Sequence, residues 1–540
     1  MKLNDTELKN EVQWKNVGIV LPKFNRTAMI ERTKIAPEWV HFGAGNIFRA
    51  FPAALQQSLL EESLTQTGVV VAEGYDGEII DRTFLSHDCL TLSVTLKSNG
   101  SIEKKIIGSV AQALRLDKVE DFAVLRKIFA AESLKMASFT ITEKGYNLTG
   151  RDGDFLPDAA EDLARAFSLA DTPKSYIGKL VIALFERYKK NLPIALVSMD
   201  NCSHNGEKLF SAVSTFAEKW TYADKDFLDY INNPEKVSFP LSMIDKITPR
   251  PDETVRQMLE DIGFSDTAVS VTAKQTYVAP FVNAEETQYL VIEDVFPNGR
   301  PPFEKIENSG IFFTDRETVD KMEKMKVCTC LNPLHTALAV FGCLLDYTKI
   351  SEEMKDPDLV KLVEIIGYKE GLPVVVDPRI VSPKAFIDQV IKERLPNPFM
   401  PDTPQRIACD TSQKIPIRFG ETIKAYMANP ALNTQDLRLI PLTLAAWVRY
   451  LLAIDDNGVA FQVSPDPLFE YLSARLKGVT FGKIGKNGDF HTALEPILSD
   501  KKIFAVNLYE AGLGERVEAL FAKLVSDVGA VRETLHSAVN

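Results

Sequence analysis

The chain is poor in the residues that build metal centres and disulfide frameworks. Its 540 residues include 6 cysteines and 6 histidines. No two cysteines form a Cys-x-x-Cys pair, and the one close pair, Cys328 and Cys330, has no partner motif that would complete a zinc site. Most cysteines lie in apolar runs, where a free thiol packs as a small hydrophobic group. We therefore expect no metal and a reducing, cytoplasmic location.

An apolar leader, long apolar runs and a basic surface are lacking as well. The chain starts with the polar residues Met-Lys-Leu-Asn-Asp-Thr-Glu, and charges interrupt its apolar runs, so we expect neither a signal peptide nor a membrane partner. The formal net charge of -12 argues against a nucleic-acid partner, which needs a basic face. The net charge does not exclude a small anionic substrate, because local lysines and arginines can bind one inside an acidic protein.

A length of 540 residues predicts two domains. Residues 1–36 are expected to form a polar extension. Over residues 37–302, apolar strands such as 68–73 and 194–199 alternate with helical segments, which is typical of a parallel, doubly wound α/β sheet of the Rossmann type. Strand signals are few over residues 303–540, so we expect a mainly α-helical domain there.

The expected Rossmann-type domain begins with a candidate dinucleotide turn. An apolar stretch runs into Gly43-Ala-Gly45, and a helical pattern follows. The glycines let the backbone approach a pyrophosphate, which the amides of the following helix can bind. Phe48 stands where the usual motif has its third glycine, so the motif gains its weight from the strand before it and the helix after it. The expected cofactor-binding residues of the turn are Gly43, Gly45, Asn46, Ile47, Phe48 and Arg49.

The choice between NAD and NADP depends on the residues after the second strand. Glu73 and Asp76 lie there, and a carboxylate in this place bonds the ribose hydroxyls of NAD. Arg82 is the nearby arginine that would have to hold the 2'-phosphate of NADP. We favour NAD, with NADP as the alternative cofactor and ordinary loop carboxylates as the structural alternative. Glu143 follows another predicted strand and is expected near the cofactor cleft.

The segment from Lys326 to His335 combines three groups suited to alcohol and ketone chemistry. A lysine with a lowered pKa can act as a general base, and the amide of Asn332 can donate to a developing alkoxide. The imidazole of His335 can orient a substrate hydroxyl or share its proton. The structural alternative is a helix start with a satisfied core histidine.

Three further segments are candidates for ligand contacts. Asn201 follows a buried strand whose carboxyl end should face the crevice of a parallel sheet, although the segment also suits a helix cap. Asp245 precedes a lysine in an apolar run, and a surface ion pair is the alternative. Arg406, Lys414 and Arg418 lie in a partly apolar segment, where they can grip a carboxylate or a sugar chain, or belong to an ordinary charged surface.

Seven segments follow one another in the order known from one enzyme family. They are G-A-G-N-I-F-R-A-F at 43–51, T-E-K-G-Y at 142–146, S-M-D-N-C-S-H-N-G at 198–206, F-P-L-S-M-I-D-K-I-T-P at 239–249, V-I-E-D-V-F-P-N-G-R-P-P at 291–302, N-P-L-H-T-A-L at 332–338 and R-I-A-C-D-T-S-Q-K-I-P-I-R at 406–418. The chain thus resembles the mannitol dehydrogenase family of long-chain polyol dehydrogenases. That family includes mannitol 2-dehydrogenases, mannonate oxidoreductases (fructuronate reductases), altronate oxidoreductases and mannitol-1-phosphate dehydrogenases.

The resemblance implies a Rossmann-type domain, a largely helical C-terminal domain, bound NAD or NADP and no metal. By position, it makes Lys326 the general acid/base, and Asn201 and Asn332 the hydrogen-bond donors to the reacting oxygen. The substrate contacts that it implies are His335, which we also count with the catalytic residues, Asp245, Arg406 and Lys414.

The chain departs from the family at the catalytic lysine. Five residues separate Lys326 from Asn332, whereas the family usually has four. Either a bulge absorbs the extra residue or the base is placed differently. Glu323, one helical turn earlier, supports the bulge, because the family often has an acid there.

These features predict an NAD-dependent oxidoreductase that interconverts a secondary alcohol and a ketone on an open-chain sugar acid. D-Mannonate/D-fructuronate is the favoured pair, because the cations at 406–418 can pair with a carboxylate. The alternatives are mannitol/fructose, whose hydroxyls the same cations can bond, and altronate/tagaturonate. An alternative of a different class is a catalytically silent dinucleotide-binding sensor, if the shifted lysine no longer reaches the substrate.

Overall fold

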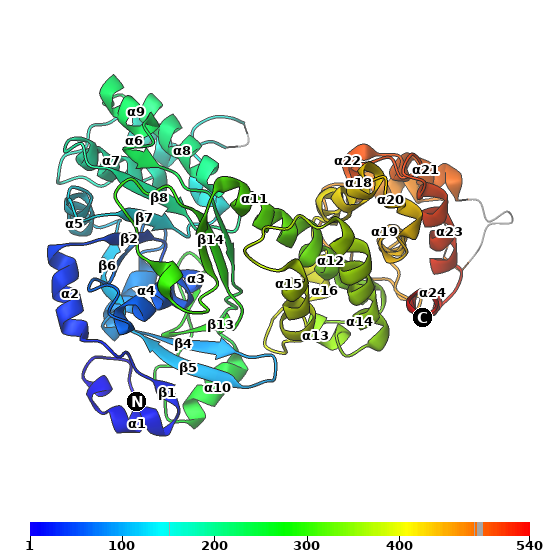
Figure 1. The fold of residues 1–540 in the computed structure, drawn as a ribbon, viewed down its shortest axis with the longest axis horizontal. Coiled ribbons are helices and arrows are strands. Elements are labelled where there is room, and N and C mark those ends of the chain that lie inside the picture. The colour runs from blue at the N-terminus through cyan, green and yellow to red at the C-terminus, as the bar shows by residue number, and fades with distance from the viewer. Residues whose placement is uncertain (151, 480, 483–489) are drawn as a thin grey trace. The chain divides into compact units, whose positions relative to one another are not determined.

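The computed structural model describes residues 1–150, 152–479, 481–482 and 490–540 (Figure 1). The chain divides into two compact units, each described by itself below. The first unit comprises residues 1–97 and 101–319, and the second comprises residues 98–100 and 320–540. The domain boundary at residue 302 stays a prediction.

A six-stranded parallel sheet forms the centre of the first unit. In its order, β6-β3-β2-β7-β8-β9, the strand that comes first in the sequence, β2, lies in the middle, and later strands lie on both sides of it. Ligands bind such sheets where the order reverses, here between the carboxyl ends of β2 and β7. The strands are β2 (Trp39–Phe42), β3 (Val69–Glu73), β6 (Val110–Arg115), β7 (Met136–Phe139), β8 (Ile194–Ser198) and β9 (Val237–Ser238).

Helices cover both faces of this sheet, so its central strands are buried throughout. Val40 and Phe42 pack in one core cluster with Leu180, whereas Trp39 packs in another with Leu55. Adjacent residues of a strand point to opposite faces, and both faces are buried here. The main covering helices are α4 (Pro52–Glu61), α5 (Val119–Phe129), α7 (Tyr176–Tyr188) and α8 (Asn205–Lys219).

The N-terminal extension is a folded part of the first unit. Leu3, Trp14 and Ile19 are buried, and the extension's strand pairs parallel with β5. Its elements are α1 (Glu11–Asn16), β1 (Ile19–Val20) and α2 (Arg26–Ile35). The remaining sheets of the unit are β1-β5-β4-β13, β10-β14-β15 and β11-β12. Their other strands are β4 (Thr91–Leu96), β5 (Ile102–Ile107), β10 (Ser242–Asp245), β11 (Ser270–Val271), β12 (Tyr277–Val278), β13 (Phe281–Glu285), β14 (Tyr289–Glu293) and β15 (Ile311–Thr314).

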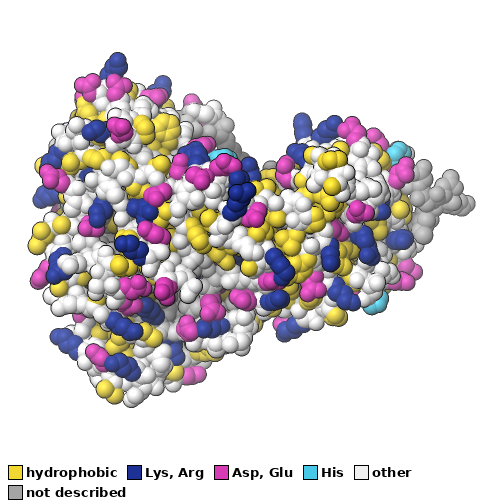
Figure 2. Space-filling view, viewed as in Figure 1, with side chains coloured by type: hydrophobic (Ala, Val, Ile, Leu, Met, Phe, Trp, Pro, Cys, Tyr) yellow, Lys and Arg dark blue, Asp and Glu magenta, His cyan; other side chains and the backbone are white. Residues whose placement is uncertain are grey.

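The first unit presents both signs of charge to solvent. On the described surface that Figure 2 shows, lysines and arginines are interspersed with acidic side chains over this unit. Mixed charge of this kind is usual for a solvated surface.

The second unit is mainly helical, as predicted, and its described residues contain no strand. Helix α19, which is buried along its whole length, lies in its core. The buried carboxylate of Glu370 accepts the amides of Arg438 and Leu439, both at 2.7 Å, and that of Ile440 at 2.8 Å, so it caps this helix. The helices are α12 (Asn332–Leu344), α13 (Ile350–Glu353), α14 (Pro357–Glu364), α15 (Pro383–Gln389), α16 (Pro404–Ile407), α17 (Thr411–Ile415), α18 (Glu421–Ala428), α19 (Leu439–Tyr450), α20 (Phe469–Arg475), α21 (His491–Leu498), α22 (Lys501–Phe504), α23 (Gly514–Leu524) and α24 (Ala530–Val539), after α11 (Arg316–Lys324).

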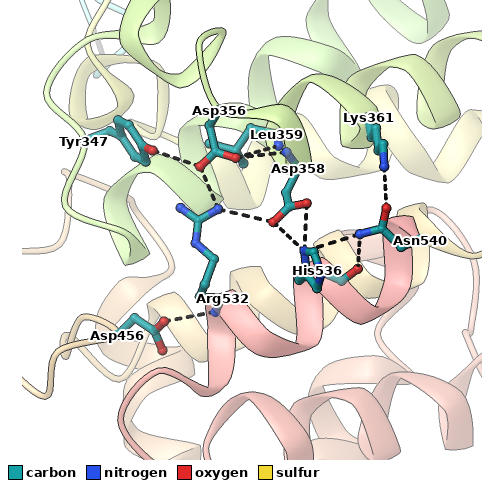
Figure 3. Close-up of polar contacts among 9 residues, drawn as sticks. All are labelled: Tyr347, Asp356, Asp358, Leu359, Lys361, Asp456, Arg532, His536 and Asn540. Atoms are coloured by element: carbon teal, nitrogen blue, oxygen red, sulfur yellow. Dashed lines mark hydrogen bonds and ion pairs between the residues drawn. The ribbon is translucent and has the colours of Figure 1, made fainter.

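Charged groups dock the C-terminal helix α24 within the second unit (Figure 3). Asp456 accepts the amides of Val531 and Arg532 at 2.8 and 2.9 Å. The Arg532 guanidinium lies 2.6 Å from Asp356, and Asp356 also accepts the hydroxyl of Tyr347 at 2.9 Å. Burial alone would raise the pKa of Asp356, but Tyr347 and Arg532 bring it below its ordinary value.

The sequence expectation about apolar runs was wrong at one place. The helical stretch Arg316–Leu344 is long and apolar enough, by length and composition alone, to cross a membrane. Its apolar window is 78% buried within the protein, as in the core helix of a globular fold.

Candidate functional site

Gly43 shapes the dinucleotide turn after β2. Its φ is +101°, and a Cβ at this position would lie 2.3 Å from the carbonyl oxygen of Thr140, which follows β7. Only glycine allows the backbones to approach so closely at the point where the strand order reverses. Gly45 has a φ of -74° and open space beside it. The two glycines therefore differ: the fold requires Gly43, whereas Gly45 leaves room for a ligand.

A buried carboxylate holds this turn in place. Glu73, at the end of β3, accepts the amide of Ala44 at 2.9 Å and those of Tyr75 and Asp76 at 2.7 and 3.1 Å. Burial raises the pKa of Glu73, although these amides act in the opposite direction. Glu73 thus supports the turn through the backbone, and its predicted bond to a ribose stays a prediction.

Phe48 fills the place of the third glycine with core packing. Its buried ring stacks on His41, with ring centroids 4.3 Å apart. The His41 nitrogens lie 2.7 Å from Ser138 Oγ and 2.8 Å from Thr140 Oγ1, and burial lowers its pKa to about 3, so the ring is neutral. The prediction that Phe48 contributes to cofactor binding stays a prediction.

Arg49 is a buried cation beside the turn. It is 1% exposed and donates to the carbonyl of Ala279 and to Asn46 Oδ1, both at 2.8 Å. Burial lowers its pKa to about 10, so it keeps its charge at neutral pH. No described residue gives it a carboxylate partner. A buried charge without a counter-ion is costly, which marks this place as suited to an anion.

A cavity of about 400 Å³ lies beside Arg49. It brings most of the predicted turn residues together with residues of other segments. Its lining consists of Ala44, Gly45, Asn46, Ile47, Arg49, Ile79, Thr248, Arg250, Gln275, Thr276, Tyr277 and Val278.

Asp200 organises the adjacent ends of β7 and β8. Its carboxylate accepts the amides of Ile141 and Thr142 at 3.0 and 2.8 Å, and the hydroxyl of Tyr146 at 2.5 Å. Burial raises the pKa of Asp200. The loop that it holds carries Glu143, which is exposed and forms an ion pair with Lys208.

Two predicted substrate-site residues lie at other strand ends of the first unit. Asn201 is exposed directly after Asp200, and Asp245 is buried at the end of β10. Lys246 donates to the carbonyl of Glu285 at 2.9 Å and to Gln288 Oε1 at 3.0 Å, which secures the chain beside Asp245.

Lys326 lies in a π-helical turn, η6 (Met325–Cys330), immediately before α12. It is 5% exposed. The amide of Leu331 donates to the Lys326 carbonyl at 3.1 Å, which is a bond over five residues. Such a turn absorbs one residue more than an α-helical turn, and π-helical turns often occur at functional sites. The structure therefore supports the bulge as the way in which the extra residue before Asn332 is accommodated.

Asp402 brings two predicted substrate contacts together. Its Oδ2 lies 3.3 Å from His335 Nε2, and its Oδ1 forms an ion pair with Arg406. Burial alone would raise the pKa of Asp402, but His335 and Arg406 bring it below its ordinary value. Sequence inspection missed Asp402, because the segment before Arg406 carries no motif.

Two more cations lie close to Arg406 in the second unit. Lys414 donates to the carbonyl of Ile407 at 3.1 Å and to that of Cys409, and its pKa is lowered first by burial and then by the charge of Arg418. Arg418 lies in a second π-helical turn, η10 (Pro416–Gly420), which packs against η6.

Arg418 is linked to the start of α12. Its guanidinium donates to Thr336 Oγ1, and that hydroxyl donates to the carbonyl of Asn332 at 2.9 Å. Burial lowers the pKa of Arg418 to about 10, so it stays charged. The predicted residues of the second unit, from Lys326 to Lys414, are thus connected through α12 and the segments packed on it.

Family comparisons agree with this arrangement. The family model of the mannitol dehydrogenase Rossmann domain matches residues 37–305. The family model of the mannitol dehydrogenase C-terminal domain matches residues 318–515. A D-mannonate oxidoreductase of Thermotoga maritima is 50% identical, with 100% of this chain and 99% of the relative covered. The chain belongs to the mannitol dehydrogenase family. Membership confirms the predicted fold class and the predicted class of enzyme, an oxidoreductase that acts on an alcohol carbon.

More distant members of the mannitol dehydrogenase family are similar over most of their length. A D-mannonate oxidoreductase of Escherichia coli is 28% identical, with 88% of this chain and 92% of the relative covered. A structure of Pseudomonas fluorescens mannitol 2-dehydrogenase, in ternary complex with NAD and D-mannitol, has a TM-score of 0.68 at 26% identity and 99% coverage of both chains. A substrate-free D-sorbitol dehydrogenase shares the fold, with a TM-score of 0.81 at 22% identity and 100% coverage of both chains.

Proposed function

We propose that this chain is an NAD-dependent oxidoreductase that interconverts D-mannonate and D-fructuronate. The observation that carries the choice of a sugar acid is the excess of positive charge in the second unit. Arg406, Lys414 and Arg418 lie near one another there, whereas Asp402 and Asp410 are the carboxylates beside them. A substrate carboxylate would balance this charge, and Arg guanidinium groups match its geometry. The name of the 50% identical relative supports the same substrate.

The cavity beside the dinucleotide turn is the proposed site of NAD. The close approach at Gly43, the open space at Gly45 and the uncompensated charge of Arg49 suit a diphosphate. Glu73 and Asp76, both carboxylates next to the turn, would repel the 2'-phosphate of NADP. When bound, NAD supplies the acceptor for the hydride that leaves the substrate carbon.

The residues of the chain handle the proton and the charge on oxygen. In oxidation, Lys326 takes the proton of the substrate hydroxyl while the hydrogen on the same carbon leaves with its electron pair, so a C=O bond forms. In reduction, Lys326 returns the proton. Asn201 and Asn332 donate hydrogen bonds to the reacting oxygen, as preorganised donors do for developing negative charge. Asp245, His335 and the cations position the rest of the sugar acid.

The remaining predicted roles belong to the same proposal. Ile47 lines the cavity, and Glu143 lies in the loop after β7, from which we expect it to approach the cofactor. The six cysteines are free, which suits a cytoplasmic enzyme.

A substrate panel tests the proposal. Oxidation of NADH at neutral pH is followed with fructuronate, tagaturonate, fructose and fructose 6-phosphate, and again with NADPH. We expect fructuronate with NADH to give the highest kcat/KM. A preference for fructose would assign the cations to hydroxyl groups, and a preference for tagaturonate would change the stereochemistry of the site. NADH binding without turnover on any of them would favour the silent sensor.

A further inference from the structure

A short hairpin without any sequence motif lines the same cavity as the dinucleotide turn. Strands β11 and β12 pair antiparallel, and the turn between them is closed by bonds from the Thr272 amide to the Thr276 carbonyl at 3.0 Å and from the Gln275 amide to the Thr272 carbonyl at 2.9 Å. The hairpin supplies Gln275, Thr276, Tyr277 and Val278 to the cavity wall. It therefore lies where it can contact whatever the turn binds.

One buried carboxylate fixes the hairpin to the end of β3. Asp76 Oδ2 accepts the hydroxyl of Thr272 at 2.6 Å and that of Thr276 at 2.8 Å, and the residue is 3% exposed. The sequence predicted that Asp76 would bond a ribose. In the structure, Asp76 Oδ2 accepts the two hairpin hydroxyls, and the predicted bond to a ribose stays a prediction. Hydrogen bonds to a charged, buried acceptor are stronger than those between neutral groups.

The other polar attachments of the hairpin are more exposed, whereas Val278 packs in a buried core cluster. The Ala273 amide donates to Glu78 Oε1 at 3.2 Å, and Arg82 donates to the Val271 carbonyl at 3.1 Å. Lys274 Nζ lies 4.0 Å from the ring centroid of Tyr75. Exposed contacts of this kind contribute little, so Asp76 is the main polar anchor.

The hairpin also positions a second cation beside the buried Arg49. The guanidinium of Arg250 lies 4.8 Å from the ring centroid of Tyr277, and both residues line the cavity. Arg49 Nε is buried without a hydrogen-bond partner. Within the described residues, neither arginine has a carboxylate partner. Two cations from separate segments of one cavity wall suit a ligand with two negative charges.

We propose that the β11–β12 hairpin is a wall of the cofactor site, that Asp76 is the positioning residue that holds it there, and that Arg250 contacts the diphosphate of the cofactor. This inference rests on the proposed binding of NAD in this cavity. If the hairpin detaches, the fraction of protein that can bind falls, and the apparent Kd rises by the same factor.

The test measures NADH affinity by fluorescence titration, without substrate, together with hydrogen exchange over residues 270–278. Asp76→Ala should raise the Kd for NADH about tenfold and speed exchange in the hairpin. Asp76→Asn keeps an oxygen acceptor and should restore part of both. If Asp76→Ala fails to fold by circular dichroism, the double variant Thr272→Val/Thr276→Val removes the same bonds and leaves the carboxylate in place.

Arg250→Ala separates contact from positioning. It should raise the Kd for NADH about tenfold and reduce its salt dependence, with hairpin exchange unchanged. Glu253→Gln is the matched control, because this exposed acid pairs with Arg256 on the neighbouring helix α10 (Glu253–Asp261) and should change neither readout.

The outcomes distinguish a failure of the hairpin inference from a failure of the proposed NAD binding. Wild-type affinity and exchange in Asp76→Ala would overturn its positioning role, and wild-type affinity in Arg250→Ala would overturn the diphosphate contact, in both cases with NAD binding intact. If the wild-type protein binds neither NADH nor NADPH, the proposed function falls and this inference falls with it.

Discussion

Around the candidate site residues, the two units hold their polar groups in different ways. In the first unit, buried carboxylates bond backbone amides: Glu73 fixes the dinucleotide turn and Asp200 fixes the loop after β7. In the second unit, side chains contact one another across segments: Asp402 lies 3.3 Å from His335, and Arg418 donates to Thr336. The first arrangement fixes the backbone of the proposed cofactor site. The second brings together cations whose positive charge a substrate carboxylate can balance. Substitutions in the first unit should therefore weaken cofactor binding, whereas those in the second unit should lower turnover or raise KM.

The largest effect is expected at Lys326, in the second unit. Lys326→Ala removes the proposed general acid/base and should lower kcat by roughly 10³-fold. NADH affinity should stay at the wild-type level, because the turn around Gly43 lies in the first unit. Single-turnover kinetics with fructuronate, beside fluorescence titration of NADH, give both values. Turnover near that of the wild type would show that another group moves the proton.

Gly43→Ala is the corresponding test of the first unit. A methyl group at φ +101° and 2.3 Å from the Thr140 carbonyl strains the backbone, so we expect a loss of about 3 kcal/mol in the free energy of unfolding and weaker NADH binding. Thermal unfolding and NADH titration measure the two effects.

Gly45→Ala is the matched control for this substitution. It should leave stability within about 0.5 kcal/mol, because its φ is ordinary and the space beside it is open. It should still weaken NADH binding, because Gly45 lines the cavity. Equal losses of stability in both variants would contradict the different roles of the two glycines.

Asp402→Asn tests how the second unit gathers its cations. It keeps the shape of the side chain and removes the charge that holds His335 and Arg406, so kcat/KM for fructuronate should fall about tenfold, mainly through KM. Asp388→Asn is the control, since Asp388 forms exposed ion pairs with Lys384 and Lys392 on α15 and η9 (Val390–Arg394). An unchanged KM would mean that His335 and Arg406 hold their positions without Asp402.

The sequence predicted local features of the first unit better than contacts between distant segments. Continuous apolar strands and the Gly43 turn are local signals, and they led to the doubly wound sheet. The folding of the N-terminal extension was not evident, because its buried residues, Leu3, Trp14 and Ile19, are widely spaced. Asp402 and the β11–β12 hairpin were missed, because each acts on a residue far away in the sequence. No motif marks such contacts.

The π-helical turn at Lys326 was predicted only in part. Counting residues revealed the insertion, but composition does not encode which hydrogen bonds a helix uses. Both alternatives, a bulge and a displaced base, followed from the same count. The bond from Leu331 to Lys326 supports the bulge, because it extends over five residues and so accommodates one residue more than an α-helical turn, while the position of the base stays a prediction.

Deletion of Cys328 is expected to have the smallest effect on kcat. It tests whether the π-helical turn only absorbs the extra residue before Asn332. A π-helical turn shortened by one residue returns to an α-helical turn, so α11 and α12 should keep their relation and Lys326 its place. We expect kcat within about tenfold of the wild type, against the roughly 10³-fold loss in Lys326→Ala. The control inserts an alanine after Cys328: one turn cannot absorb a second extra residue, and a misplaced base should cost roughly 10²-fold. Loss of activity on deletion, with the helical circular dichroism retained, would show that the base depends on the longer turn, and that this chain aligns its catalytic lysine differently from its family.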